Sequence, residues 1–118
     1  MADPILPLRG GEAVDAAAVP ELPVEVFQRA LSGSLAAGAR AVACWGEPAA
    51  GGAVRVTAVL ADDGAHELGV LSTLAAGSLP SLAEAHPGMQ LFERELAEQC
   101  GVVPQGHPWM KPVRFQPP

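Results

Sequence analysis

The sequence is poor in aromatic residues and cysteine, and it lacks tyrosine altogether. With two tryptophans and three phenylalanines among 118 residues, the core must be built mainly from small aliphatic side chains. The two cysteines, Cys44 and Cys100, lie far apart without a CxxC or CxxH neighbour, so this chain offers no zinc or iron–sulfur ligand set. We expect both to be buried thiols.

Positive charge and long apolar runs are also scarce. The net charge of -6 argues against nucleic acid or an anionic membrane surface as a partner. The longest apolar runs, such as residues 53–61, are far shorter than the ~20 residues that cross a bilayer. The N-terminus lacks the basic flank and apolar stretch of a secretion signal. We therefore expect a soluble, cytosolic chain with no direct membrane insertion.

The chain has a length typical of one domain, with proline-rich ends. Residues 1–22 combine several prolines with a Gly-Gly pair, which predicts a flexible arm. Residues 23–103 carry the periodic apolar patterns of a single α+β domain. Residues 104–118 are too short and too rich in proline for another packed element, so they predict an extended docking tail.

The predicted fold is α+β, with an N-terminal helix, an antiparallel three- to four-stranded meander, a C-terminal helix and the proline-rich tail. Apolar residues recur at helical spacing from Pro23 to Gly38. Three strands are predicted over residues 40–46, 53–61 and 66–74, with gaps short enough for hairpins. A second helix begins at Pro87 and ends at Gly101, with Met89, Phe92, Leu96 and Cys100 on its apolar side.

A charged cluster on the second helix contains Glu93, Arg94, Glu95 and Glu98. Arg94 and Glu98 are four residues apart, which is the spacing for an ion pair on one helix face. Most charge runs on helices lie on the solvated surface, and that is the ordinary interpretation of this cluster taken alone. General acid–base catalysis would need a pocket and opposed environments, which the sequence does not supply.

The three histidines are not spaced to share a metal ion, and we interpret His66 and His86 as independent surface or loop residues. His107 lies between Gly106 and Pro108, which could aim its ring at a partner or allow a hydrogen bond back to the helix end. We interpret His107 as structural.

The C-terminal third carries a motif that resembles a known family. In order, it contains Leu79-Pro80-Ser81-Leu82, Phe92-Glu93-Arg94-Glu95, Glu98, Gly101-Val102 and Gly106-His107-Pro108. This order and spacing resemble the signature of the thirty-kilodalton subunit family of respiratory NADH-quinone oxidoreductase, with Glu98 and Val102 as conservative variants. The form Gly-His-Pro-Trp-Met-Lys-Pro-Val-Arg looks closer to relatives in energy-converting nickel–iron hydrogenases and formate hydrogenlyase.

The resemblance implies a non-catalytic accessory or assembly subunit that docks on a large quinone-site or hydrogenase-like subunit, beside an iron–sulfur subunit. The partners would carry the Fe–S clusters and the quinone or NiFe site, and this chain would bind no cofactor. The complex would hold it at the cytoplasmic side of the cell membrane. No catalytic or metal-binding residues are expected. The expected interaction motif comprises Glu93, Arg94, Glu95, Glu98, Gly101, Gly106, His107, Pro108, Trp109, Met110 and Arg114.

Two alternatives remain open from the residues alone. A stand-alone small enzyme would use Glu93, Glu95 or His107, and it requires these side chains to converge in a closed cleft. A ligand-binding module would instead require a sizeable apolar pocket between helix and sheet.

Overall fold

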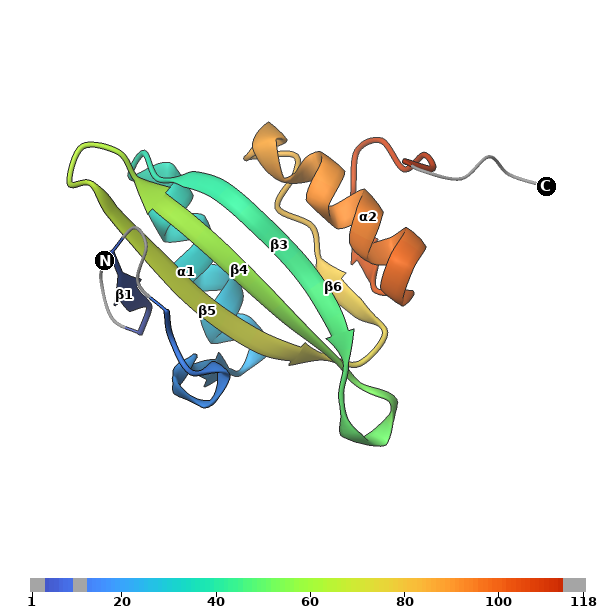
Figure 1. Ribbon diagram of the computed structural model, residues 1–118. Coiled ribbons are helices and arrows are strands. Elements are labelled where there is room, and N and C mark those ends of the chain that lie inside the picture. Colours follow the sequence, from blue (N-terminus) through green and yellow to red (C-terminus); the bar gives the residue numbers. More distant parts are fainter. Residues whose placement is uncertain (1–3, 10–12, 114–118) are drawn as a thin grey trace.

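The protein, seen in a computed structural model that describes residues 4–9 and 13–113, has the predicted α+β fold (Figure 1). Its main sheet has five strands in the order β1-β5-β4-β3, and β2 also pairs with β5. The strands are β1 (Leu6–Leu8), β2 (Glu21–Leu22), β3 (Arg40–Pro48), β4 (Val54–Asp62), β5 (Glu67–Ala75), β6 (Ser78–Pro80) and β7 (Val103–Gln105). The helices are α1 (Val24–Ala36) and α2 (Gln90–Cys100), with short 3-10 turns at Ala16–Ala18, Ala50–Gly52 and Pro87–Met89.

The long strands β3, β4 and β5 form the predicted antiparallel meander. Each has nine residues, and each ends within two residues of its predicted bounds. The β4–β5 register runs without a break from Val54↔Ala75 to Asp62↔Glu67. β3 pairs with β4 with one irregularity, between Ala41 and Ala43. The Val, Ala and Leu content of the three segments and the short gaps between them therefore predicted the sheet correctly.

The N-terminal segment is not wholly the loose arm that its composition predicted. β1 pairs antiparallel with β5, β2 pairs parallel with β5, and Ile5 is buried. The carbonyl of Pro20 accepts hydrogen bonds from the backbone N–H and the hydroxyl of Ser72. The prediction was wrong here because proline is tolerated on an edge strand, where its missing N–H would face away from the sheet.

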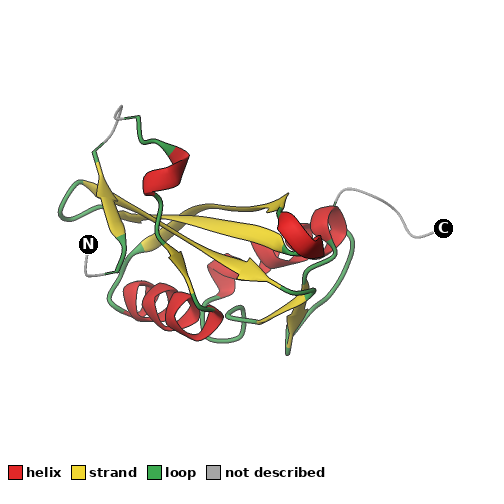
Figure 2. Cartoon of the chain, turned by 90° about the horizontal axis from the view of Figure 1, so that it is seen from below, coloured by secondary structure: helices red, strands yellow, loops and turns green. Residues whose placement is uncertain are grey.

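α1 covers one face of the sheet and α2 lies along its β3 side, and both contribute side chains to the same core cluster (Figure 2). Val56, Ala58 and Leu60 of β4 point to this face, and Phe27 and Leu31 of α1 pack into the same cluster. From the other side of the core come Met89 and Leu96, with Val102 just after α2. The core is therefore built mainly from small aliphatic side chains, as the composition predicted.

A second, two-stranded sheet positions the C-terminal part of the chain. β6 and β7 pair in parallel, and Ser81 N–H donates to the carbonyl of Gln105 at 2.8 Å. α2 ends at Gly101, whose φ of 70° is the left-handed conformation expected of a glycine stop. The pairing of β6 with β7 brings the start of the β6–α2 connection next to the start of the tail. Among the described residues, no helix is long and apolar enough to span a membrane.

Candidate functional site: the joint between α2 and the tail

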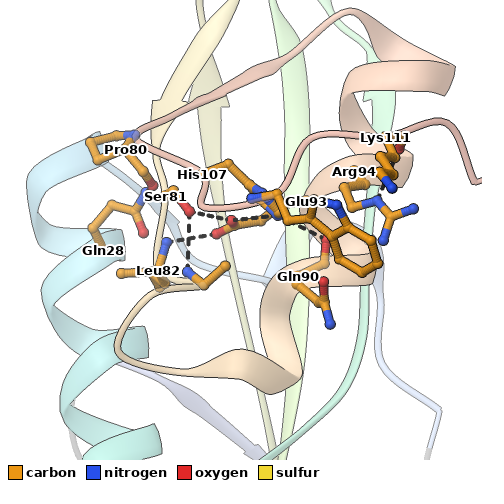
Figure 3. Close-up of polar contacts among 11 residues, drawn as sticks. Gln28, Pro80, Ser81, Leu82, Gln90, Glu93, Arg94, His107 and Lys111 are labelled. Atoms are coloured by element: carbon orange, nitrogen blue, oxygen red, sulfur yellow. Dashed lines mark hydrogen bonds and ion pairs between the residues drawn. The ribbon is translucent and has the colours of Figure 1, made fainter.

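Glu93 is a buried carboxylate at the centre of the joint, not part of a solvated face. Its Oε1 accepts a hydrogen bond from the Ser81 hydroxyl at 2.6 Å, and its Oε2 accepts one from the Leu82 N–H at 2.7 Å (Figure 3). Only 6% of Glu93 is exposed, so these two bonds replace the water that a charge would otherwise need. Glu93 therefore ties α2 to the turn that follows β6.

His107 lies on the other side of the same carboxylate. Its Nε2 is 3.9 Å from Glu93 Oε1 and 3.2 Å from the carbonyl of Gln90, and its side chain is fully buried. Its Nδ1 accepts a hydrogen bond from the Trp109 N–H at 3.0 Å, so in the neutral ring Nε2 carries the proton and donates to Gln90. The ring thus bonds to the start of α2 and not to its C-terminal end.

Arg94 holds the tail itself. Its Nε donates to the carbonyl of Lys111 at 2.9 Å, and its Nη2 donates to the carbonyl of Pro112 at 3.2 Å. Two cations lie over the Trp109 ring, with the Arg94 guanidinium 5.3 Å and the Lys111 ammonium 4.5 Å from its centroid. The ordinary interpretation of the charged cluster as a solvated face does not hold for Arg94, since only 9% of this residue is exposed.

Glu98 extends the same row of contacts one turn further along α2. Its Oε1 accepts a hydrogen bond from the Val113 N–H at 3.2 Å. The tail backbone is thus held at residues 107–113, while Trp109, Met110 and Val113 keep 52%, 47% and 38% of their surface exposed. Hydrogen bonds made by His107, Arg94 and Glu98 thus hold the tail on α2, and the apolar side chains of the tail face outward.

The remaining predicted site residues divide between those near the joint and those away from it. Gly106, with φ of 83°, turns the chain before His107, and Pro108 links the two residues that share a hydrogen bond. Glu95 does not converge with Glu93, because it lines a different hollow between α2 and β3. Arg114 lies outside the described residues.

Sequence reasoning missed several of the groups that complete the joint. Ser81 was noticed only as part of the family pattern, and the backbone groups of Leu82, Gln90 and Lys111 carry no sequence signal of their own. His86, expected to be independent, has its Nε2 3.3 Å from the hydroxyl of Ser32 on α1. Such contacts join residues more than ten positions apart, so only the fold shows them.

The Cys44 thiol is buried beneath the joint, and Cys100 is half-buried at the end of α2. Burial, and secondarily the negative charge of Glu93, raise the pKa of Cys44 to about 12. This thiol is therefore protonated and unreactive near neutral pH. Its behaviour is that of a small core residue.

Two features of the described residues bear on catalysis and on ligand binding at the joint. The Ser81 hydroxyl bonds to Glu93 and not to a histidine, so it lacks the general base that a serine nucleophile needs. The cavity between α1, α2 and the sheet measures about 20 Å³, whereas ligand pockets span about 300–1,000 Å³. The core is thus too tightly filled for a small-molecule site.

Comparison with known proteins agrees with this structural interpretation. The family model described as "Respiratory-chain NADH dehydrogenase, 30 Kd subunit" matches residues 37–117, which include β3 and all the elements that follow it. No curated protein matches the chain.

Proposed function

The chain belongs to the family of the 30 Kd subunit of respiratory-chain NADH dehydrogenase, and from this premise we propose that it is a non-catalytic accessory subunit. Its role is to dock on the large, catalytic-type subunit of an oxidoreductase complex. An adjacent iron–sulfur subunit completes the assembly, and the redox centres belong to these partners.

One observation carries the proposal. α2 fixes the backbone of residues 111–113 through Arg94 and Glu98, while Trp109 and Met110 remain about half exposed. Exposed Trp and Met side chains on an ordered backbone are typical of interface anchors. Because the tail already has its shape, less entropy is lost when it binds.

The type of complex is a finer part of the same proposal. The run from Gly106 to Val113, Gly-His-Pro-Trp-Met-Lys-Pro-Val, favours an energy-converting nickel–iron hydrogenase over an NADH-quinone oxidoreductase. In either complex the chain is peripheral on the cytoplasmic side of the membrane and is held there by its partners.

Purification of the intact complex tests both parts. A tagged chain isolated from its own cells should bring down a large subunit encoded by a neighbouring reading frame and an iron–sulfur subunit, both identified by mass spectrometry. Nickel together with iron in the complex supports the hydrogenase type. Iron without nickel assigns the quinone type, and a chain that elutes alone contradicts the docking role.

A further inference from the structure

The face of the main sheet opposite α1 carries a hollow beside the N-terminal segment. Side chains of a strand alternate between the two faces, so Thr57 on β4 points away from the core that Val56 and Ala58 help to form. The 3-10 turn at Ala16–Ala18 lies over this outer face, on the other side of the sheet from α1 (Figure 2). The hollow has a volume of about 590 Å³, within the range of small-ligand sites.

The strands align the side chains that line this hollow. In the register of the sheet, Trp45 lies opposite Thr57, and Thr57 lies opposite Ser72. Two residues further along β3, Glu47 lies opposite Arg55. The N-terminal segment completes the lining with Ala16, Ala17, Val19 and Glu21. An indole ring, two hydroxyls and three ionisable groups therefore surround one space.

The Thr57 hydroxyl is an unused polar group in this hollow. Only 5% of Thr57 is exposed, and its hydroxyl makes no hydrogen bond to any residue that the structure describes. Buried side-chain hydroxyls nearly always have such a partner. The neighbouring Ser72 hydroxyl donates to the carbonyl of Pro20, so only its lone pairs are left for a further contact. A ligand that donates hydrogen bonds would satisfy both oxygens.

The charged groups of the hollow leave a negative charge in excess. The Nε and Nη2 of Arg55 both donate to Glu21 Oε2, at 3.1 Å and 2.7 Å, so Glu21 balances this guanidinium. Glu47 is exposed, and it makes no ion pair within residues 4–9 and 13–113. Two carboxylates and one guanidinium sum to a net charge of -1, which favours a cationic ligand over an anion such as phosphate.

Trp45 adds a preference for a flat cation. Its side chain lines the hollow next to Thr57 and is 44% exposed. The face of a tryptophan ring attracts cations, and a planar guanidinium can stack on it while its N–H groups point outward in the plane. A guanidinium has five N–H donors and no acceptor, which suits a carboxylate and two hydroxyl oxygens.

We propose that this hollow binds a small molecule that carries a guanidinium group. The guanidinium stacks on the Trp45 ring and donates hydrogen bonds to the Glu47 carboxylate and the Thr57 hydroxyl. The lining residues come from residues 16–21 and from β3, β4 and β5, so the site does not depend on the docking role of the tail.

Titration of the whole chain with arginine amide tests the site. The ¹H–¹⁵N resonance of the Trp45 indole should shift and saturate, whereas that of Trp109 on the tail should not move. Lysine amide has a cation without a planar head, and citrulline amide has a planar head without the charge. Each should bind about tenfold more weakly than arginine amide. No saturable shift, equal shifts of both tryptophans, or equal affinity for arginine and citrulline amides overturns the proposal.

Three variants assign the contacts. Thr57→Val removes the hydroxyl, Glu47→Gln removes the charge, and each should weaken the binding of arginine amide about tenfold. Because Glu47 is exposed, Glu47→Gln should keep the melting temperature of the wild type, so a loss of binding does not reflect unfolding. Glu84→Gln is the matched control, because Glu84 is also exposed but lies between β6 and α2. It should change the affinity by less than twofold, and equal affinities of Glu47→Gln and Glu84→Gln contradict the proposal.

A blocked peptide distinguishes a small molecule from an arginine of another protein. Trp45 and residues 16–21 bound the hollow on two sides and restrict the room for residues that flank an arginine. Acetyl-Gly-Arg-Gly-amide should therefore bind about tenfold more weakly than arginine amide. A peptide that binds as tightly as arginine amide would overturn the small-molecule assignment and assign the hollow to a protein arginine.

Discussion

Glu93 is a charged residue whose role in the structure depends on its burial. As part of a Glu-Arg-Glu run it suggests a solvated surface, yet both its oxygens accept hydrogen bonds from the β6–α2 turn. Nothing local in the sequence distinguishes it from Glu95, because its partners are 11 and 12 residues away. The motif was therefore predictable, but its buried position was not.

Replacing Glu93 tests this assignment. Glu93→Ala should lower the free energy of unfolding by about 2–4 kcal/mol, because it leaves the Leu82 N–H and the Ser81 hydroxyl without their acceptor. Glu93→Gln keeps one acceptor and should cost less, about 1 kcal/mol. Urea unfolding measures both. Losses below about 0.5 kcal/mol in each variant would match a solvated face instead.

The raised pKa of Cys44 leads to a prediction for the free energy of unfolding at alkaline pH. Its folded pKa of about 12 lies above the ordinary 9.0, so the folded chain keeps this proton after the unfolded chain has lost it. The stability contribution is complete below pH 9 and is lost as the pH rises from 9 towards 12. At 1.36 kcal/mol per pKa unit, the loss is at most about 4 kcal/mol.

Unfolding of the wild type and of Cys44→Ala across this pH range isolates the effect. The variant should be less stable at pH 8, but its stability should fall less steeply above pH 9. Parallel curves for the two proteins would show that this thiol is not the group responsible.

At the scale of elements, periodic segments were predictable and short ones were not. α2 was found from its apolar spacing and from Gly101, and β4 from its alternating residues. β1, β2, β6 and β7 have two or three residues each, and their pairing depends on distant strands. Local propensity cannot define such elements, because the energy that orders them comes from non-local contacts.

The contact between α2 and the tail gives a prediction about a whole segment. Arg94→Ala removes two hydrogen bonds to tail carbonyls and one stacking contact, so residues 109–113 should exchange their amides faster. Arg94→Lys keeps the charge but cannot donate to both carbonyls with the geometry of a guanidinium. The exchange rates of this variant should therefore lie between those of the wild type and Arg94→Ala. Unchanged exchange and an unchanged melting temperature in Arg94→Ala would refute the role of this side chain.

Packing of α2 against β3 gives a second prediction at this scale. A Cβ at Gly46 would lie 2.9 Å from Cys100 Sγ and from Val54 Cγ1, so Gly46→Ala should cost about 1–3 kcal/mol. A Cβ at Gly33 in α1 would have nothing within 4 Å, so Gly33→Ala should stabilise by up to about 1 kcal/mol. Thermal unfolding compares them, and a neutral Gly46→Ala would contradict the close approach.

At the scale of the molecule, the residues that stabilise the fold are different from the exposed residues that we propose for docking. The helices and one face of the sheet enclose the core, while the tail presents the exposed apolar side chains of Trp109, Met110 and Val113. The sequence predicted the fold class. Through the family motif, it also identified α2 and the tail as the candidate functional region. The sequence left open whether the tail is ordered without a partner, because this depends on α2 side chains that contact the tail backbone.

The measurement that tests the docking claim most directly is the affinity of the isolated chain for its large subunit, with and without a change in the exposed tail. Met110→Asp should weaken binding at least tenfold without altering the melting temperature, because it places a charge where an apolar anchor is buried. Leu74→Asp, at an exposed apolar position away from the tail, should bind like the wild type. Equal affinity of Met110→Asp and the wild type would contradict the account.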